Sequence, residues 1–299
     1  MNIKYLSSKA FSLVELMITL VLSLLITYAI AQVLISSNRS SATSDGMSQS
    51  QETGRFIMSF LARQIRQAGL DSIESDRFVA APFVSCSEFP ALVVDNACIT
   101  ENPGGEDQDS ISNNGIHGDR LAISLVLPAG NLIDCTGSTG YIPNGGTTIT
   151  PYEANDTIIN TFWVEADAAT GASSLRCKGF LFDGTDVLGA STAQSIANGV
   201  EAMQILYGEA DDALPSSGNR NISHYIPAPV DPAAPTAIEV TNWDRVYAVK
   251  ISLLTRSIAD VTNSNTLRTY ILANAEPYEM TDAVSRQVFT TTFVINNYK

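Results

Sequence analysis

The sequence predicts an α+β protein with one long N-terminal helix followed by a β-rich globular head. No proline occurs between Phe11 and Leu70, so a helix can run through nearly all of this segment. After Gly69 the composition changes to short β-rich runs separated by Gly, Asn, Asp and Pro. We therefore divide the chain into an N-terminal leader, an apolar helix, a second helical part and the head, at residues 1–10, 11–36, 37–70 and 71–299.

The composition indicates a folded and acidic protein. Of the 299 residues, 45% are hydrophobic, which is enough to form a sizeable core. The chain has 31 Asp and Glu against 17 Lys and Arg, a net charge of −14. Phosphate backbones attract basic surfaces, so this charge argues against nucleic acid as a partner.

The apolar segment is long enough to cross a membrane. Residues Phe11 to Ser36 contain no Lys, Arg, Asp, Gly or Pro, and Glu15 is the one charged residue among them. At about 1.5 Å per residue the segment spans roughly 39 Å, more than the ~30 Å of a hydrocarbon core. Lys4 and Lys9 precede it, and a short basic flank stays in the cytoplasm. We expect a single-pass inner-membrane protein with its C-terminal head in the periplasm.

Glu15 needs a separate explanation, because a carboxylate inside a membrane costs about 2.5–3.5 kcal/mol at a helix centre and less near an end. A position in the headgroup layer is the alternative reading. The run Lys9-Ala10-Phe11-Ser12-Leu13-Val14-Glu15-Leu16-Met17 resembles the prepilin signal of type IV pilins and type II secretion pseudopilins. In that family a basic leader ends in a small residue, usually Gly, and a glutamate is the fifth mature residue. Ala10 departs from the usual Gly.

The resemblance implies a processing and assembly mechanism. Prepilin peptidase would cut between Ala10 and Phe11 and methylate the new Phe11 amine, and the mature subunit would later reach the pilus at the cell surface. Within the membrane that amine would pair with Glu15 of a neighbouring subunit, which favours entry into a fibre because an unpaired charge is costly there. The implied partners are prepilin peptidase, other minor and major pilins, the inner-membrane assembly platform and membrane lipid.

The second helical part is amphipathic. Its apolar residues recur at spacings of one, three and four and are expected on one face, while arginines occupy the other faces. The apolar residues are Phe56, Ile57, Phe60, Leu61 and Ile65, and the arginines are Arg55, Arg63 and Arg66. We expect Gly46 and Gly54 to soften the helix and Gly69 to mark its end.

The head is predicted to contain six strands. Each is a run of alternating or continuous β-formers bounded by turn residues. They are Leu121–Leu127, Thr157–Val164, Leu175–Phe182, Ala202–Tyr207, Val246–Thr255 and Val288–Ile295. The intervals 101–118 and 211–236 are predicted to be loops or insertions.

Four blocks narrow the resemblance further. They resemble the PilW-type minor pilins and, more distantly, the J-type pseudopilins of type II secretion, and they lie at residues 51–69, 197–208, 242–257 and 285–297. The implied role is a scarce priming or tip subunit of a type IV pilus. The alternatives are a J-type pseudopilin and an anchored adhesin or DNA-uptake tip subunit. Residues 71–195 carry no such resemblance.

Four cysteines follow the anchor, in the part of the chain that would be exported, and their even number suggests disulfides. Three pairings are possible; we favour Cys86–Cys98 and Cys135–Cys177 because sequence neighbours close the smaller loops. Four reduced core thiols are the alternative. A zinc site is disfavoured because no pair has the short CxxC spacing.

No catalytic motif accompanies the two histidines, His117 and His224, which we read as solvated loop residues. An enzyme is therefore not predicted. Acidic clusters are also read as solvated loops, with Ca²⁺ as the weaker alternative and no other cofactor. The clusters are Glu101, Glu106, Asp107 and Asp109; Asp183 and Asp186; and Glu209, Asp211 and Asp212. The weak Ca²⁺ candidates are Asp183, Asp186, Asp211 and Asp212.

Overall fold

The computed structural model describes residues 12–68, 93–94, 97–98, 118–127, 131–166, 172–183, 187–210, 221–228, 240, 245–258, 266–275 and 277–295. The chain forms two compact units, Met1–Asp45 and Gly46–Lys299, and each is described by itself. The structure is α+β, with one long apolar helix followed by a β-rich region, as the sequence predicts.

Helix α1 runs from Leu13 to Gln67. We call residues 13–45, which lie in the first unit, its proximal half and residues 46–67, in the second unit, its distal half. The buried residues of α1 all lie in the distal half and recur every three or four positions, so they share one face. They are Gly46, Ser50, Gly54, Ile57, Met58, Leu61 and Ile65.

Two details of the distal half differ from the prediction. Phe56 is 47% exposed, because neighbouring helix residues point about 100° apart and Ile57 takes the buried direction. Gly46 and Gly54 do not interrupt the helix; both are buried. The ring of Phe289 occupies the space that a Cβ on Gly54 would need. Glycine therefore permits close packing at this position.

A seven-stranded antiparallel sheet forms one part of the second unit, with the order β3-β6-β7-β8-β4-β5 and β9 paired with β7. Its strands are β3 (Leu121–Val126), β4 (Gly140–Pro143), β5 (Thr150–Pro151), β6 (Thr157–Ala166), β7 (Ser173–Phe182), β8 (Val187–Ala190) and β9 (Gln194–Asn198). The longest pairing joins β6 and β7, from Thr157 opposite Phe182 to Ala166 opposite Ser173.

A four-stranded antiparallel sheet forms the other part, with the order β11-β10-β12-β15. Its strands are β10 (Val200–Ala210), β11 (Ile222–Ile226), β12 (Val246–Arg256) and β15 (Arg286–Val294). Strand β10 is buried along its whole length, so both of its faces are covered.

Two short ribbons complete the described strands. Strands β13 (Arg268–Tyr270) and β14 (Tyr278–Met280) pair with each other, and so do β1 (Val93–Val94) and β2 (Ala97–Cys98). Tyr278 joins an apolar cluster with Ala202 of β10 and Leu254 of β12. Its hydroxyl also accepts a hydrogen bond from the Gln204 amide at 3.1 Å. The β13–β14 ribbon therefore covers part of the outer face of the four-stranded sheet.

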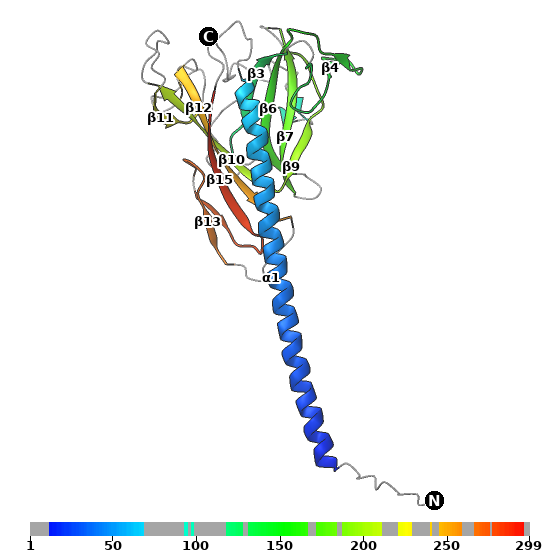
Figure 1. Cartoon of the computed structure of the whole chain (residues 1–299). Coiled ribbons are helices and arrows are strands. Elements are labelled where there is room, and N and C mark those ends of the chain that lie inside the picture. Colours follow the sequence, from blue (N-terminus) through cyan, green and yellow to red (C-terminus); the bar gives the residue numbers. More distant parts are fainter. Residues whose placement is uncertain are drawn as a thin grey trace, which may run out of the picture. The chain divides into compact units, whose positions relative to one another are not determined.

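The distal half of α1 packs into the core that both sheets share. Ile57, Leu61 and Ile65 belong to one cluster with residues of β3, β6, β7, β10 and β12. Figure 1 shows strands of the two sheets on either side of this part of the helix. The sheets are joined directly at Asp119, whose N–H donates to the Met203 carbonyl at 2.8 Å and whose carboxylate accepts from the Ile205 N–H at 2.7 Å.

All six predicted strands are present, with their ends shifted by a few residues (β3, β6, β7, β10, β12 and β15). The interval 211–236, predicted to be loops or insertions, contains the strand β11, which was not predicted. This five-residue strand is mostly exposed, and its pairing with the end of β10 decides its conformation more than its own sequence does. The other short strands, such as β4, β5, β8 and β9, were missed for the same reason.

Candidate assembly interface

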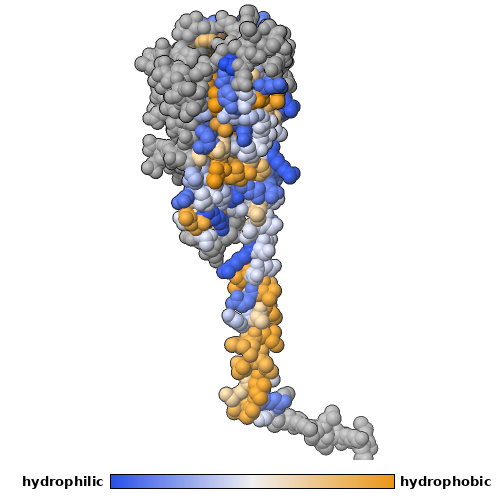
Figure 2. Space-filling view, turned by 90° about the vertical axis from the view of Figure 1, so that its left-hand side faces the viewer, coloured by the Kyte–Doolittle hydropathy of each residue, from blue (hydrophilic) through white to orange (hydrophobic). Residues whose placement is uncertain are grey.

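Residues 13–35 of the proximal half expose an almost purely apolar surface. Leu13 is 75% exposed and Val33 is 68% exposed, and every described residue of this half up to Ser41 is classed as exposed. Figure 2 shows the hydrophobic surface of this segment. Water disfavours such a surface, so the proximal half is suited to lipid or to the apolar helices of other subunits.

The few hydroxyl groups in this apolar surface are satisfied within the helix. Thr19 donates to the Leu16 carbonyl at 2.9 Å, and Thr27 donates to the Ser23 carbonyl at 2.8 Å. Ser23 donates to the Leu20 carbonyl at 2.9 Å. Such bonds remove the cost of placing a hydroxyl in hydrocarbon. Among the described residues, α1 is the one helix long and apolar enough to cross a membrane.

Glu15 lies in the first turn of α1. The helix begins directly after Ser12, whose carbonyl accepts the first helical hydrogen bond from Leu16 at 3.1 Å. The positive end of the helix dipole favours an acidic residue at this position. Ala10 and Phe11, the predicted cleavage site, lie outside the described residues.

The distal half of α1 has a second surface, opposite its buried face. Six exposed residues at helical spacing lie on it: Ser48, Gln51, Glu52, Arg55, Phe56 and Ser59. Arg55 and Arg63 are exposed, as the sequence predicts. One face of the distal half is therefore buried in the core, and the opposite face is exposed to solvent.

A buried ion-pair network holds the end of the four-stranded sheet at which β15 begins. Glu201 of β10 accepts from Arg256 Nη1 of β12 at 3.1 Å and from Arg286 Nη2 of β15 at 3.0 Å, and also from Arg286 Nε. Arg286 donates two further bonds of 2.6 Å to Asp282. Three strands are thus tied together by one buried carboxylate.

The charges in this network shift one another's pKa. Hydrogen bonds from Arg286 hold the pKa of the Asp282 carboxyl below its ordinary value. Burial alone would lower the pKa of Arg286, but its hydrogen bonds to Asp282 and Glu201 outweigh burial, and the pKa is raised. The ion pairs of Arg286 therefore favour its charged form.

A second ionic cluster ties the other end of this sheet and corrects two sequence assignments. Glu209 was read as part of a solvated acidic loop, but it lies buried in β10. It lies 3.4 Å from Arg245 Nε and 3.5 Å from His224 Nε2. His224 was read as a loop residue, but it lies in β11 directly opposite Glu209. Both residues help to attach β11 to β10.

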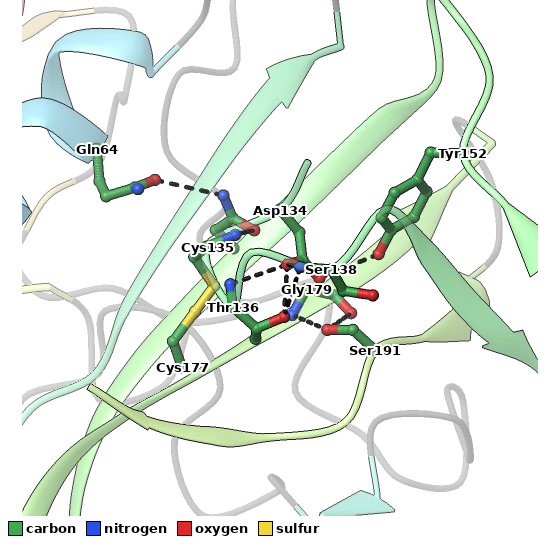
Figure 3. The surroundings of a disulfide bond; sticks show 10 residues. Gln64, Asp134, Cys135, Thr136, Ser138, Tyr152, Cys177, Gly179 and Ser191 are labelled. Carbon is green, nitrogen blue, oxygen red and sulfur yellow. Dashed lines mark hydrogen bonds between the residues drawn. A yellow bond between two sulfur atoms is a disulfide. The ribbon is translucent and has the colours of Figure 1, made fainter. Parts of the chain in front are cut away.

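The Cys135–Cys177 disulfide, one of the two predicted pairings, joins the loop before β4 to strand β7 (Figure 3). Next to it, the buried Asp134 carboxylate accepts from the Thr136 and Ser138 N–H groups at 2.8 and 3.0 Å. The Tyr152 hydroxyl donates to it at 3.2 Å, and burial together with the Asp134 charge raises the pKa of Tyr152. The bridge therefore lies in a rigid, fully bonded turn.

This turn is also linked to α1. The Asn160 side chain of β6 accepts from the Cys135 N–H at 3.1 Å and donates to Gln64 of the helix at 3.5 Å. Cys177 is fully buried in the core that contains Ile57, Leu61 and Ile65. The disulfide thus braces the sheet surface on which the distal half of α1 packs.

Several other predicted residues are not brought together in the described structure. Cys86, His117, Asp186, Asp211 and Asp212 lie outside the described residues, as do Glu101, Glu106, Asp107 and Asp109, and nothing is described of the Cys98 side chain. Asp183 directly follows β7. Among the residues that the structure describes, no three His, Cys, Asp or Glu side chains gather as metal ligands would.

The β-rich part of the chain matches a known family. Residues 161–297 match the model of PilW, the Type IV Pilus-assembly protein W. The match therefore relates the chain to proteins of type IV pilus assembly. The match covers β6 to β15 and includes the predicted blocks 197–208, 242–257 and 285–297, while α1 lies outside it. No curated protein and no solved structure matches the chain.

Proposed function

We propose that this chain is a minor pilin of a type IV pilus, cleaved by prepilin peptidase after Ala10 and acting as a priming or tip subunit. The observation that carries the proposal is the division of α1. One continuous helix has an exposed apolar half with a carboxylate in its first turn, and a second half embedded in a β-rich unit. The match of residues 161–297 to a pilus-assembly family supports the same role from an independent part of the chain.

In this proposal the proximal half of α1 first anchors the subunit in the inner membrane, with the β-rich unit in the periplasm, and later packs against other pilin helices. Glu15 pairs with the N-terminal amine of a neighbour. In a medium of low dielectric constant each charge is costly alone, so the pair forms at one register and resists sliding. The partners are prepilin peptidase, other minor and major pilins, and the inner-membrane assembly platform.

The size of the β-rich unit supports a low-copy subunit located at the pilus tip. Residues 46–299 form one compact unit, large compared with the helix that would carry it into a fibre. A bulky unit is easiest to accommodate where no further subunit lies above it. This supports a subunit that starts assembly or ends the fibre over one that repeats along it.

Gene deletion followed by complementation tests the proposal. Deletion should sharply reduce surface pili counted by electron microscopy, while the major pilin remains in the membrane. Complementation with Glu15→Ala should restore pili poorly, because the N-terminal amine of the neighbour then has no carboxylate partner. Glu52→Ala is the matched control: it removes an exposed carboxylate from the outer surface of the distal half and should restore pili fully.

The same strains separate the alternatives. Normal piliation with failed protein secretion would indicate a J-type pseudopilin instead. Normal pilus numbers with lost attachment or DNA uptake would indicate a tip adhesin or uptake subunit without a priming role. The match to a pilus-assembly family favours the pilus over the secretion system.

A further inference from the structure

Strand β15 forms one edge of the four-stranded sheet. It pairs with β12 from Arg286 to Val294 without a register shift, and its other side has no neighbouring strand among those that the structure describes. Alternate residues of such a strand direct their backbone N–H and C=O groups away from the sheet. An edge of this kind can hydrogen-bond to another strand.

The outward-directed groups can be identified from one hydrogen bond. The Ile295 N–H donates to the Tyr247 carbonyl at 3.0 Å, so this pair is of the hydrogen-bonded type. Every second residue before Ile295 therefore also points its backbone groups toward β12. The residues between them direct their backbone groups outward: Val288, Thr290, Thr292 and Val294. In the described part of the chain none of these outward N–H and C=O groups has a hydrogen-bond partner.

The same four residues are accessible. Val288 is 39% exposed and Val294 is 53% exposed, and Thr290 and Thr292 are also exposed. On the opposite face Phe293 is buried and Phe289 packs against Gly54 of α1. The core thus fixes β15 in an extended conformation, and no described strand pairs with its outer edge, so an incoming strand would meet a preformed template.

This edge lacks the features that normally prevent strand pairing. Residues 287–294 contain no charged residue, no proline and no glycine, and no bulge interrupts the ladder. The opposite edge, β11, has five residues and a register shift where it meets β10. In the larger sheet, β5 has two residues and ends in Pro151. The other edge of that sheet, β3, is six residues long, uncharged and regular, but it is buried along nearly its whole length. Among the described edges, β15 alone is long, regular, uncharged and exposed.

Two-fold pairing of β15 with β15 of a second copy does not fit a fibre of parallel subunits. Thr255 lies opposite Gln287 and its hydroxyl is 2.7 Å from that of Ser50, while Phe289 packs on Gly54. Strand β15 therefore advances in the same direction as α1, beside which it lies in Figure 1. Two-fold pairing of β15 with its copy would be antiparallel and would make the two distal halves of α1 run in opposite directions. Subunits whose distal halves pack side by side in one fibre, as the proposed function requires, need the same direction.

We propose that the free edge of β15 accepts an extended segment from a different subunit of the same pilus. The four outward residues offer one N–H and one C=O each, and their side chains select an uncharged segment rich in β-branched residues. A charged segment is disfavoured because Val288, Thr290, Thr292 and Val294 offer it no counter-charge. The identity of the partner as a pilus subunit rests on the proposed function.

Photo-crosslinking in cells that produce the full chain tests this directly. A photoreactive amino acid is placed at Val288 or at Thr292, and adducts from the membrane fraction are identified by mass spectrometry. The control position is Ala154, an exposed turn residue of the larger sheet. We expect an adduct with another pilus subunit from both β15 positions and none from Ala154.

Thr290→Pro sharpens the test. It removes an outward N–H that the ladder with β12 does not use, so the fold should tolerate it, while an incoming strand loses a hydrogen bond and meets the ring. Thr290→Val removes the same hydroxyl and keeps the N–H, which makes it the matched control. We expect the adduct to fall about tenfold with Thr290→Pro and to persist with Thr290→Val. If Thr290→Pro does not accumulate, Thr292→Lys replaces it.

The proposal is overturned if no adduct forms, or if adducts form only within the chain, with a second copy or with a protein outside the pilus system. An adduct that Thr290→Pro leaves unchanged also overturns it. Failure of the proposed function is read separately, because the deletion strain would then still make pili. A strain that needs this chain for piliation but yields no β15 adduct contradicts the edge proposal alone.

Discussion

The two halves of α1 share one helical backbone and differ in what surrounds them. In the proximal half, large apolar side chains such as Leu13 and Val33 are exposed, and Glu15 is its charged residue nearest the start. In the distal half, Ile57, Leu61 and Ile65 are buried completely in the shared core of two sheets. Apolar residues in a helix can thus form either an exposed apolar surface or a buried packing face. The residues around each apolar stretch decide which of the two it forms.

Small residues mark where the packed half begins. Gly46, Ser50 and Gly54 are four residues apart, so they lie in one row on the buried face. The Ser50 hydroxyl contacts that of Thr255, and the Phe289 ring packs directly on Gly54. A row of small residues that contains two glycines lets a sheet approach a helix closely, and the apolar run from Leu13 to Ile35 contains no glycine. The comparison predicts that changes in the distal half alter folding, whereas changes in the proximal half alter assembly.

The largest expected effect on folding comes from the disulfide that braces the distal half. The paired variant Cys135→Ala with Cys177→Ala opens a loop of 42 residues. Loop-closure entropy predicts a loss of about 4 kcal/mol from the free energy of unfolding. Chemical denaturation of the full chain in detergent would measure it, and membrane insertion, which depends on the proximal half, should be unchanged. A loss below about 1 kcal/mol would show that the sheet does not need the bridge.

Leu61→Ala against Leu25→Ala compares the two halves with one chemical change. Leu61 is completely buried and Leu25 is 56% exposed. We expect Leu61→Ala to lower the free energy of unfolding by about 3 kcal/mol, because it removes buried methyl groups and leaves a cavity. Leu25→Ala should change it by less than about 0.5 kcal/mol. Thermal melts of both variants check this, and equal losses would mean that the halves fold as one.

Gly54→Ala tests the close approach of Phe289. A Cβ at this position would overlap the aromatic ring, so the ring must shift or the edge strand must move outward. We expect a loss of about 1–2 kcal/mol, even though alanine is the better helix former. Ser59→Ala, on the exposed surface of the same half, should be neutral or slightly stabilising. A stabilised Gly54→Ala variant would refute the packing role of glycine.

The smallest effect is expected at Asp282, where the pH dependence can be stated. Hydrogen bonds from Arg286 lower the pKa of the folded carboxyl, so its stabilisation is complete above the unfolded value and is lost as the pH falls through the folded value. Asp282→Asn should cost less than about 1 kcal/mol at neutral pH, because the side chain is 40% exposed. Its melting temperature should also fall less than that of the native chain below about pH 4. If Asp282→Asn and the native chain lost the same melting temperature on acidification, the ion pair between Asp282 and Arg286 would be contradicted.

Periodicity and turn chemistry were sufficient for the long helix and the six main strands. The apolar face was largely right, but Phe56 lies beside it and is 47% exposed, whereas Met58, on the other side of Ile57, is buried. Glu209 was predicted to be solvated because a buried ion pair depends on partners from elsewhere in the chain: Arg245 is 36 positions away from Glu209 in the sequence. The network around Glu201 was missed for the same reason. His224 lies in a strand and not in a loop, but its side chain is exposed as predicted.

The short strands illustrate the same limit. Strand β11 carries the weak pattern ISHYI, and only β10 beside it makes it a strand. By contrast, the open edge of β15 has a readable signal, since QVFTTTFV is long, uncharged and free of proline and glycine. That signal predicts a strand, but it does not say whether the strand is central or at an edge. Sheet order supplies that information.

Quantitative mass spectrometry of sheared pili tests the central claim most directly, because it examines the proximal half in its assembled state. The proposed function predicts a peptide that begins with N-methyl-Phe11, present at a small fraction of the commonest pilin. Absence of this chain from pili, or an intact Met1 terminus in them, would contradict assembly through a processed α1. Parity with the commonest pilin would contradict the priming or tip role while leaving the pilin assignment in place.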